Sequence, residues 1–169
     1  MRIYLIGYMA CGKTTLGKEL AQKLSLSFLD MDKYLEKKYF KTIPQIFEEE
    51  GEAGFRLKEQ ACLHEVSEFE DIVIATGGGA PCFFDNMEVM NRTGICIFLD
   101  VEAEELGRRL LAAKVERPLV KGKSPEELVR FIEGMLAKRR PYYEQASYII
   151  TGTNIRLQEI LSRIEFEHE

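Results

Sequence analysis

Five short apolar runs alternate with longer stretches of helical periodicity, and this alternation is the feature that most limits the possible folds. The runs have the length and composition of buried strands, and they cover residues 2–6, 26–30, 71–76, 94–100 and 146–151. Strands separated by helices form βαβ units, whose parallel sheet is covered on both faces. The pattern therefore predicts an α/β fold with three α/β/α layers around a five-stranded parallel sheet.

The helical segments carry their own start signals. Ser124 is a good N-cap, Pro125 suits the first helical position, and Glu127 completes a capping box. An apolar stripe follows at residues 128, 131, 132, 135 and 136, and the last helix repeats it at 157, 160, 161 and 164. Residues 112–123 fit no regular element and are basic, with Gly and Pro. A loop of that length in a compact domain is usually functional or disordered.

Size and charge limit the class of protein. The chain has 169 residues and a net charge of −5, which suits one domain over residues 1–169 and argues against a broad nucleic-acid surface. It has no secretory signal and no apolar run of membrane-spanning length, so we expect a cytoplasmic protein without a membrane partner. With no C-x-x-C pair and only two histidines, a zinc site is disfavoured, and the four cysteines are expected to be mostly buried, reduced thiols.

The stretch from Gly7 to Thr14 fits G-x-x-x-x-G-K-[ST], the phosphate-binding P-loop. It follows a predicted strand and opens a predicted helix, which is the context the motif requires. Backbone amides, the helix N-terminus and the Lys13 ammonium would hold phosphates, and the Thr14 hydroxyl would ligate Mg²⁺. Cys11 stands at a free position and is interpreted as a small spacer. The alternative is a tight turn with an incidental lysine.

Two carboxylates, Asp30 and Asp32, follow the second strand in "FLDMD". If the strand continues, alternation places both on one face, at the sheet edge where such folds bind ligands. One carboxylate near a magnesium ion and one facing an acceptor hydroxyl would suit phosphoryl transfer. The alternative is a polar turn that caps the next helix.

Three further segments carry candidate site residues. Arg56 and Glu59 lie one helical turn apart, as in an ordinary ion pair on a solvated face. The three glycines of "ATGGGA", residues 77–79, are tolerable where another molecule approaches the backbone. Arginines in "KRRPYY", at a predicted helix end, either satisfy the helix dipole or bind a carboxylate or phosphate.

Taken together, these segments resemble one family. The P-loop, "FLDMD", "IFEEEGEAGFRLKE", "ATGGGA", "ERPLV" and "AKRRPYYEQA" occur in the order and at the spacing seen in shikimate kinases. The resemblance covers nearly the whole chain, and its combination of D-x-D, G-E-x-x-F-R-x-x-E, T-G-G-G and R-P-L is specific. It implies a P-loop kinase that transfers a phosphoryl group from ATP to a hydroxyl of shikimate, giving shikimate 3-phosphate and ADP.

The resemblance also implies residue roles. Lys13, Asp32 and Arg117 would be catalytic, with Asp32 contacting the acceptor hydroxyl and Arg117 on a mobile lid at about residues 112–123. The substrate-binding helical segment would span about residues 31–66. The ATP site would consist of Gly7, Ala10, Cys11, Gly12, Lys13, Thr14, Thr15 and Arg117, with Arg109 or Arg156 on adenine. One Mg²⁺ would be held by Thr14 and, through water, Asp30. Shikimate would be bound by Asp32, Arg56, Gly77, Gly78, Gly79 and Arg139.

The chain departs from the family pattern at two P-loop positions. Ala10 stands where glycine is common, so the backbone there must be one that alanine accepts, and Cys11 replaces a small residue.

Paired guanidinium groups favour a small carboxylated acceptor, and we expect a monomer. Two alternatives stay open: a kinase for another small polyol acid such as gluconate, and a non-catalytic P-loop module that only binds the nucleotide.

Overall fold

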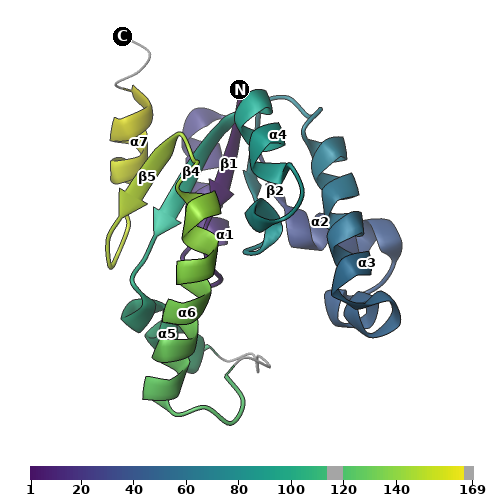
Figure 1. The fold of residues 1–169 in the computed structure, drawn as a ribbon. Helices are drawn as coiled ribbons and strands as arrows, with labels where there is room; N and C mark the ends of the chain where they lie inside the picture. The colour runs from purple at the N-terminus through teal and green to yellow at the C-terminus, as the bar shows by residue number, and fades with distance from the viewer. Residues whose placement is uncertain (114–119, 166–169) are drawn as a thin grey trace.

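Five parallel strands form the centre of the fold (Figure 1). The computed structural model describes residues 1–113 and 120–165. The sheet order is β2-β3-β1-β4-β5, with β1 at Arg2–Ile6, β2 at Ser27–Asp30, β3 at Ile72–Ala75, β4 at Ile95–Asp100 and β5 at Tyr148–Thr151. The predicted five-stranded parallel sheet is confirmed, with strand ends displaced by at most two residues from those expected.

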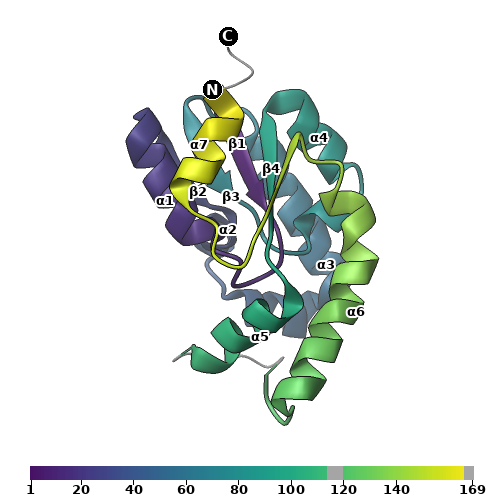
Figure 2. The same cartoon turned by 90° about the vertical axis from the view of Figure 1, so that its left-hand side faces the viewer.

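Helices cover both faces of this sheet (Figure 2). One face carries α1 (Lys13–Leu24) and α7 (Leu157–Glu165), and the other carries α3 (Ile43–Val66), α4 (Asn86–Thr93) and α6 (Pro125–Tyr143). The remaining elements are α2 (Met31–Tyr39), α5 (Ala103–Ala112) and the short 3₁₀ helix η1 (Ala80–Cys82). The three-layer α/β/α architecture is therefore confirmed.

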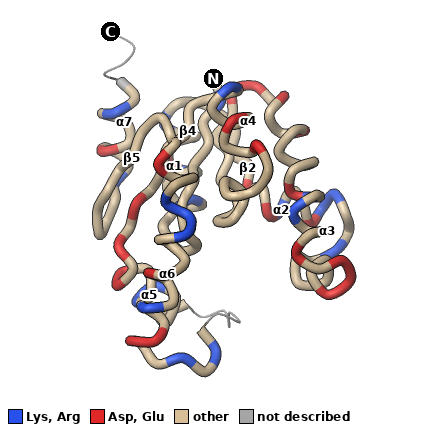
Figure 3. The backbone as a smooth tube through the Cα atoms, in the orientation of Figure 1, with Lys and Arg blue, Asp and Glu red and all other residues tan. Residues whose placement is uncertain are grey.

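The central strands are apolar on both faces because both faces are covered. Residues 3–6 of β1 are fully buried, and the strands of Figure 3 run almost uncharged between charged helices. A second, smaller apolar cluster joins α2 to α3 through Leu35, Ile46, Phe55 and Cys62. The segment at about residues 31–66 thus consists of two helices that share a core of their own, and its role in substrate binding stays a prediction.

The second strand ends earlier than the alternation argument requires. Helix α2 begins at Met31, directly after β2, so the expectation that Asp30 and Asp32 share a strand face is wrong. Asp30 is instead the N-cap of α2, and its Oδ1 accepts the N–H groups of Asp32 at 3.0 Å and Lys33 at 3.2 Å. The side-chain oxygen satisfies helix donors that have no partner within the helix.

Helix α6 begins as predicted and extends further than expected. The Ser124 hydroxyl accepts the Glu127 N–H at 3.2 Å, which confirms the N-cap. At the other end the helix passes through Pro141 and ends at Tyr143, so Arg139 lies a full turn inside it. Proline removes one helix donor and disfavours a helix interior, which is why the sequence suggested an earlier end.

The expected lid lies only partly within the described residues. Arg117 and half of the expected lid, residues 114–119, lie outside the described residues.

All four cysteines are free thiols; Cys11, Cys62 and Cys96 are buried and Cys82 is partly exposed. Among the described helices, none has both the length and the apolar character needed to cross a bilayer.

Candidate active site

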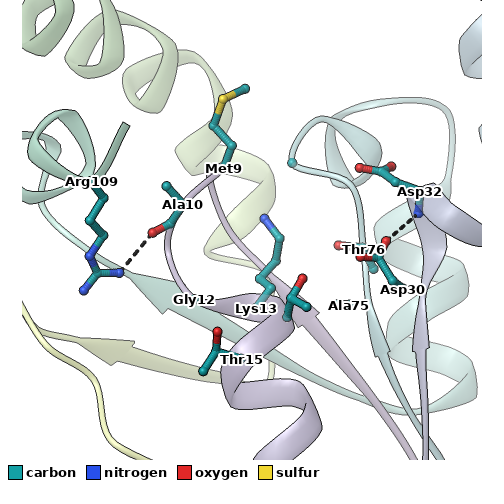
Figure 4. A pocket seen from close by; sticks show the side chains of 12 residues that line it. Met9, Ala10, Gly12, Lys13, Thr15, Asp30, Asp32, Ala75, Thr76 and Arg109 are labelled. Carbon is teal, nitrogen blue, oxygen red and sulfur yellow. Dashed lines mark hydrogen bonds between the residues drawn. The ribbon is translucent and has the colours of Figure 1, made fainter. Parts of the chain in front are cut away.

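A cavity of about 500 Å³ opens at the carboxyl ends of β1, β2 and β3. Figure 4 shows Lys13 pointing into its middle, between Arg109 on one side and the Asp30–Asp32 segment on the other. Three segments far apart in the sequence meet here because parallel strands end at the same sheet edge. The lining residues are Met9, Ala10, Gly12, Lys13, Thr14, Thr15, Asp30, Asp32, Ala75, Thr76, Gly78 and Arg109.

The glycines of the P-loop are required by its shape. Gly12 has φ 105° and is the N-cap of α1, a conformation that side chains strongly disfavour. At Gly7, with φ 147°, a Cβ would lie 2.8 Å from the Cys11 Sγ and 2.9 Å from the Leu99 carbonyl oxygen. The loop can therefore close tightly under the start of the helix, which answers why glycines stand at both positions.

The first turn of α1 is arranged to receive an anion. It contains Lys13, Thr14 and Thr15 and no acidic residue, and its N-cap is a glycine without a side chain. The free N–H groups in this turn form the positive end of the helix dipole, and no acidic side chain or side-chain cap covers them. The Lys13 ammonium donates to the carbonyl oxygens of Gly7 and, at 3.2 Å, Tyr8, which holds it over the loop.

Cys11 lies below this surface. Its side chain is 2% exposed and belongs to the core, and its N–H donates to the Tyr8 carbonyl oxygen at 3.2 Å. The interpretation as a small spacer agrees with this packing, and a role of Cys11 in binding phosphate stays a prediction.

Arg109 joins three parts of the site. It donates to the Ala10 carbonyl oxygen at 3.0 Å, to the Thr153 carbonyl oxygen at 2.9 Å and to the Glu105 carboxylate at 3.0 Å. Hydrogen bonds from Arg108 and Arg109 lower the pKa of Glu105 to about 2. Arg156 is exposed and is not among the residues that line the cavity. Of the two arginines expected near adenine, the structure brings Arg109 to the P-loop.

Ala10 holds the left-handed backbone conformation that a glycine would adopt freely, so the expectation of a conformation that alanine readily accepts is wrong. Its φ is 68°, in a region that costs a residue with a Cβ roughly 1–2 kcal/mol. We expect Ala10→Gly to raise the free energy of unfolding by about 0.5–1 kcal/mol, since relief of this strain outweighs the added chain entropy. Denaturant unfolding measures it.

Ala61→Gly is the matched control for this prediction. Ala61 is exposed in the interior of α3, where glycine costs about 1 kcal/mol. The two changes delete the same methyl group and should shift the unfolding midpoint in opposite directions. A loss of stability in Ala10→Gly would show that the loop tolerates alanine without strain.

Four polar side chains lie close to the three glycines that follow β3. A Cβ on Gly77 would lie 2.8 Å from the Asp32 carboxylate and 3.0 Å from that of Glu59. On Gly79 it would lie 2.5 Å from the Arg56 guanidinium, and on Gly78 it would lie 3.3 Å from that of Arg139. The glycines thus make room for these side chains, and close approach of a ligand to their backbone stays a prediction.

The Arg56–Glu59 pair is buried, so its interpretation as a solvated ion pair is wrong. The two groups meet at 2.8 Å with side-chain exposures of 11% and 1%, and Arg56 also stacks on Phe83, 4.1 Å from the ring centroid. Within the described part of the chain, Arg56 Nε and Glu59 Oε2 have no hydrogen-bond partner although both are buried. Such atoms are uncommon in native interiors and are often found at functional sites.

Burial shifts the two carboxyl groups of this region in the same direction. Burial raises the pKa of Asp32, with the nearby charge of Asp30 adding to the shift. Burial also raises the pKa of Glu59, against the lowering effect of Arg56. Asp32 lines the cavity and Glu59 lies beside it at Gly77, and two raised carboxyl pKa values at such a place indicate a candidate functional site.

Sequence reasoning missed two contributors, Thr76 and Tyr143, and misplaced a third, Glu59. The Thr76 hydroxyl and N–H both donate to the Leu5 carbonyl oxygen at 3.1 Å, tying β3 to β1 at the cavity. Glu59 was noticed but placed on a solvated face. Tyr143, which contacts both Arg139 and Gly78, is four residues after Arg139, a spacing that would have indicated it had the helix been expected to continue.

A parallel sheet with a P-loop after its central strand, next to a cavity lined by two carboxylates, a lysine and an arginine, defines the class: a P-loop kinase. Residues 9–166 match the family model described as shikimate kinase. The shikimate kinase of Bacteroides thetaiotaomicron is 52% identical over 172 residues, covering 95% of this chain and 98% of the relative. That of Bacteroides fragilis is 56% identical over 149 residues, covering 88% and 83%.

Solved structures agree. A crystal structure of the shikimate kinase from Bacteroides thetaiotaomicron has a TM-score of 0.92 at 49% identity, covering 99% of this chain and 98% of that one. A shikimate kinase from Acinetobacter baumannii in complex with shikimate has a TM-score of 0.82 at 39% identity, covering 99% and 91%. The chain belongs to the shikimate kinase family. The family predicted from the motifs, and with it the class of enzyme, is confirmed.

Proposed function

We propose that the chain transfers the γ-phosphoryl group of ATP to a hydroxyl of shikimate, giving shikimate 3-phosphate and ADP. The observation that carries the proposal is that the P-loop and Asp32 line the same cavity. Arg56 and Arg139 lie against the glycine loop after β3, Arg56 at Gly79 and Arg139 at Gly78, and Gly78 lines that cavity. Phosphoryl transfer depends on positioning and charge neutralisation, and this arrangement supplies both.

On the nucleotide side, the open N–H groups of α1 and the Lys13 ammonium bind the phosphates. The γ-phosphate approaches the centre of the cavity, where Lys13 points. A cation at this position counters the charge on the oxygens as the bond between the γ-phosphorus and the leaving oxygen breaks. Arg109, fixed by its three partners, borders the part of the cavity expected to hold the nucleoside.

A magnesium ion fits the residues present. The Thr14 hydroxyl and the Asp30 carboxylate line one cavity and are oxygen ligands of the kind Mg²⁺ prefers. The described residues contain no group of three or more His, Cys, Asp or Glu side chains able to hold a metal, so phosphate and water oxygens would complete its coordination. When bound, the ion would neutralise phosphate charge.

On the acceptor side, Arg56 and Arg139 orient the carboxylate of shikimate. Guanidinium groups recognise a carboxylate through paired, directed hydrogen bonds. Asp32 then faces the hydroxyl that attacks the γ-phosphorus and accepts its proton as the new P–O bond forms. Arg117 stays a prediction from the sequence, as do a monomeric state and a cytoplasmic location.

ADP formation, measured with shikimate present and absent, tests the proposal. We expect shikimate-dependent turnover that chelation of Mg²⁺ abolishes and added Mg²⁺ restores. Gluconate in place of shikimate separates the acceptors and should give no turnover. ADP release independent of shikimate, or faster with gluconate, would overturn the assignment.

Arg56→Lys tests the acceptor site alone. Lysine keeps the charge and loses the fork that binds a carboxylate at two points. We expect the KM for shikimate to rise by about tenfold or more while the KM for ATP changes little. An equal rise in both KM values would place Arg56 outside the acceptor site.

A further inference from the structure

Tyr143 is a fully buried tyrosine whose hydroxyl joins two parts of the acceptor site. The hydroxyl donates to the Gly78 carbonyl oxygen at 2.5 Å and accepts from Arg139 Nη1 at 3.4 Å. Its side chain has no exposed surface, and its ring packs against Phe98 with centroids 4.9 Å apart. One side chain thus links the loop after β3 to a residue expected to bind substrate.

The local fold explains why Tyr143 faces this way. Arg139 and Tyr143 are four residues apart on α6, so they lie on the same face of the helix. This holds only because the helix continues through Pro141. The last turn of α6 therefore presents a guanidinium and a phenol side by side toward the loop after β3.

The direction of the hydrogen bonds follows from the chemistry of the phenol. A tyrosine hydroxyl has one proton to donate and lone pairs to accept. Burial raises the pKa of Tyr143, so the proton stays on the oxygen and is directed to the Gly78 carbonyl. The lone pair is then left for Arg139, and the three groups form a chain in which each bond polarises the next.

Two aromatic side chains and a glycine surround the Arg139 guanidinium. Besides Tyr143, its carbon lies 5.2 Å from the centroid of the Tyr8 ring, within reach of a cation–π interaction. Its Nη1 lies 3.3 Å from the place a Cβ on Gly78 would occupy. Tyr8 lies against the guanidinium, the absent side chain of Gly78 leaves it room, and the Tyr143 hydroxyl is the hydrogen-bond acceptor that ties it to the loop.

The hydroxyl is not needed to fill the core. A phenylalanine at position 143 would keep the contact with Phe98 and nearly the same volume. A buried hydroxyl is costly unless it is hydrogen-bonded, and here its partners are a guanidinium and a loop carbonyl of the cleft.

We propose that Tyr143 is a positioning residue for the acceptor: its hydroxyl fixes the Arg139 guanidinium against the loop at Gly78, so that shikimate meets a preorganised carboxylate site. The inference rests on the proposed function. It assigns the tyrosine no contact with the substrate, since its effect passes through Arg139 and the loop.

Tyr143→Phe is the direct test, with steady-state kinetics for both substrates. We expect the KM for shikimate to rise by about tenfold, because small displacements of an orienting group are costly. The KM for ATP should stay within about twofold of the wild-type value, since the P-loop is not altered.

Tyr4→Phe is the matched control. Tyr4 is equally buried, and its hydroxyl is hydrogen-bonded at 2.7 Å to Oγ1 of Thr93, the last residue of α4. Neither residue lines the cavity. This variant should lower the unfolding midpoint without changing either KM. If Tyr143→Phe lowers the midpoint in the same way and leaves the KM for shikimate unchanged, Tyr143 is only structural and the proposal is wrong.

A double-mutant cycle with Arg139→Ala tests the route of the effect. In the Arg139→Ala background, Tyr143→Phe should change the KM for shikimate by less than about twofold, because there is no guanidinium left to position. Additive effects would overturn the proposal. Failure of the proposed function looks different, since the wild-type protein would then form no ADP in response to shikimate.

A second variant covers the case in which Tyr143→Phe does not fold. Incorporation of 3,5-difluorotyrosine at position 143 keeps the ring and the hydroxyl but makes the oxygen a weaker acceptor for Arg139. It should still raise the KM for shikimate selectively, though less strongly. An unchanged KM in this variant would overturn the proposal.

Discussion

Replacement of Lys13 by alanine is expected to lower kcat/KM by about 10³-fold, a decrease typical of removing a hydrogen-bond donor that stabilises the transition state. Lys13 is the cation in the middle of the cavity, and its loss leaves the transferring phosphoryl group without that charge. The fold should survive, because the hydrogen bonds of the ammonium within the described residues go to two carbonyl oxygens of the loop, those of Gly7 and Tyr8. Steady-state kinetics and thermal unfolding of the same preparation separate the two effects.

Lys23→Ala is the control, since it removes the same charge from the same helix. Lys23 is exposed in the last turn of α1, away from the cavity. Its replacement should leave kcat/KM close to the wild-type value. A Lys13→Ala enzyme that keeps most of its turnover would mean that this ammonium does not serve the transferring phosphoryl group.

The architecture was predictable because the signals for it are local and repeated. Each strand is a short apolar run, and each intervening helix has its own periodicity, so small errors at the ends do not change the order of elements. The P-loop was predictable for a similar reason: Gly7, Gly12 and Lys13 stand in one short segment between a strand and a helix, and the backbone shape needs those residue types.

The acceptor site was harder to derive because its residues meet only after the chain has folded. Arg56 and Glu59 have the spacing of an ordinary surface pair, and nothing in that spacing tells that α3 turns them toward the glycines after β3. The assignment of Arg56 to substrate came from the family resemblance. Burial of an ion pair is a tertiary property, so periodicity alone placed it wrongly on a solvated face.

Local competition between two structures explains the error at Asp30. The alternation argument extended the strand through Asp32, whereas an aspartate that can accept N–H groups two and three residues ahead favours the start of a helix. The helix cap forms in place of the longer strand. Both carboxylates still line the cavity, because Asp32 then lies in the first turn of α2. The roles expected for the two residues stay predictions, and the place of both side chains in the cavity is compatible with them despite the wrong expectation about their backbone.

The position of Asp32 at the cavity leads to the second prediction of a large effect on activity. Asp32→Asn should lower kcat by about 10²–10⁴-fold, the range for loss of a general base, while the KM for ATP changes little. The amide is nearly the same size, so it fits the space beside Gly77 where the carboxylate lies. What it loses is the ability to accept the proton of the attacking hydroxyl.

Asp30→Asn is the natural counterpart, two residues away. Asparagine caps a helix as well as aspartate does, so α2 should keep its start. If Asp30 serves the metal and Asp32 the acceptor, Asp30→Asn should chiefly raise the concentrations of ATP and Mg²⁺ required, and Asp32→Asn should chiefly lower kcat. The opposite result, with Asp32→Asn acting mainly on ATP, would move Asp32 to the nucleotide side and leave the acceptor hydroxyl without its base.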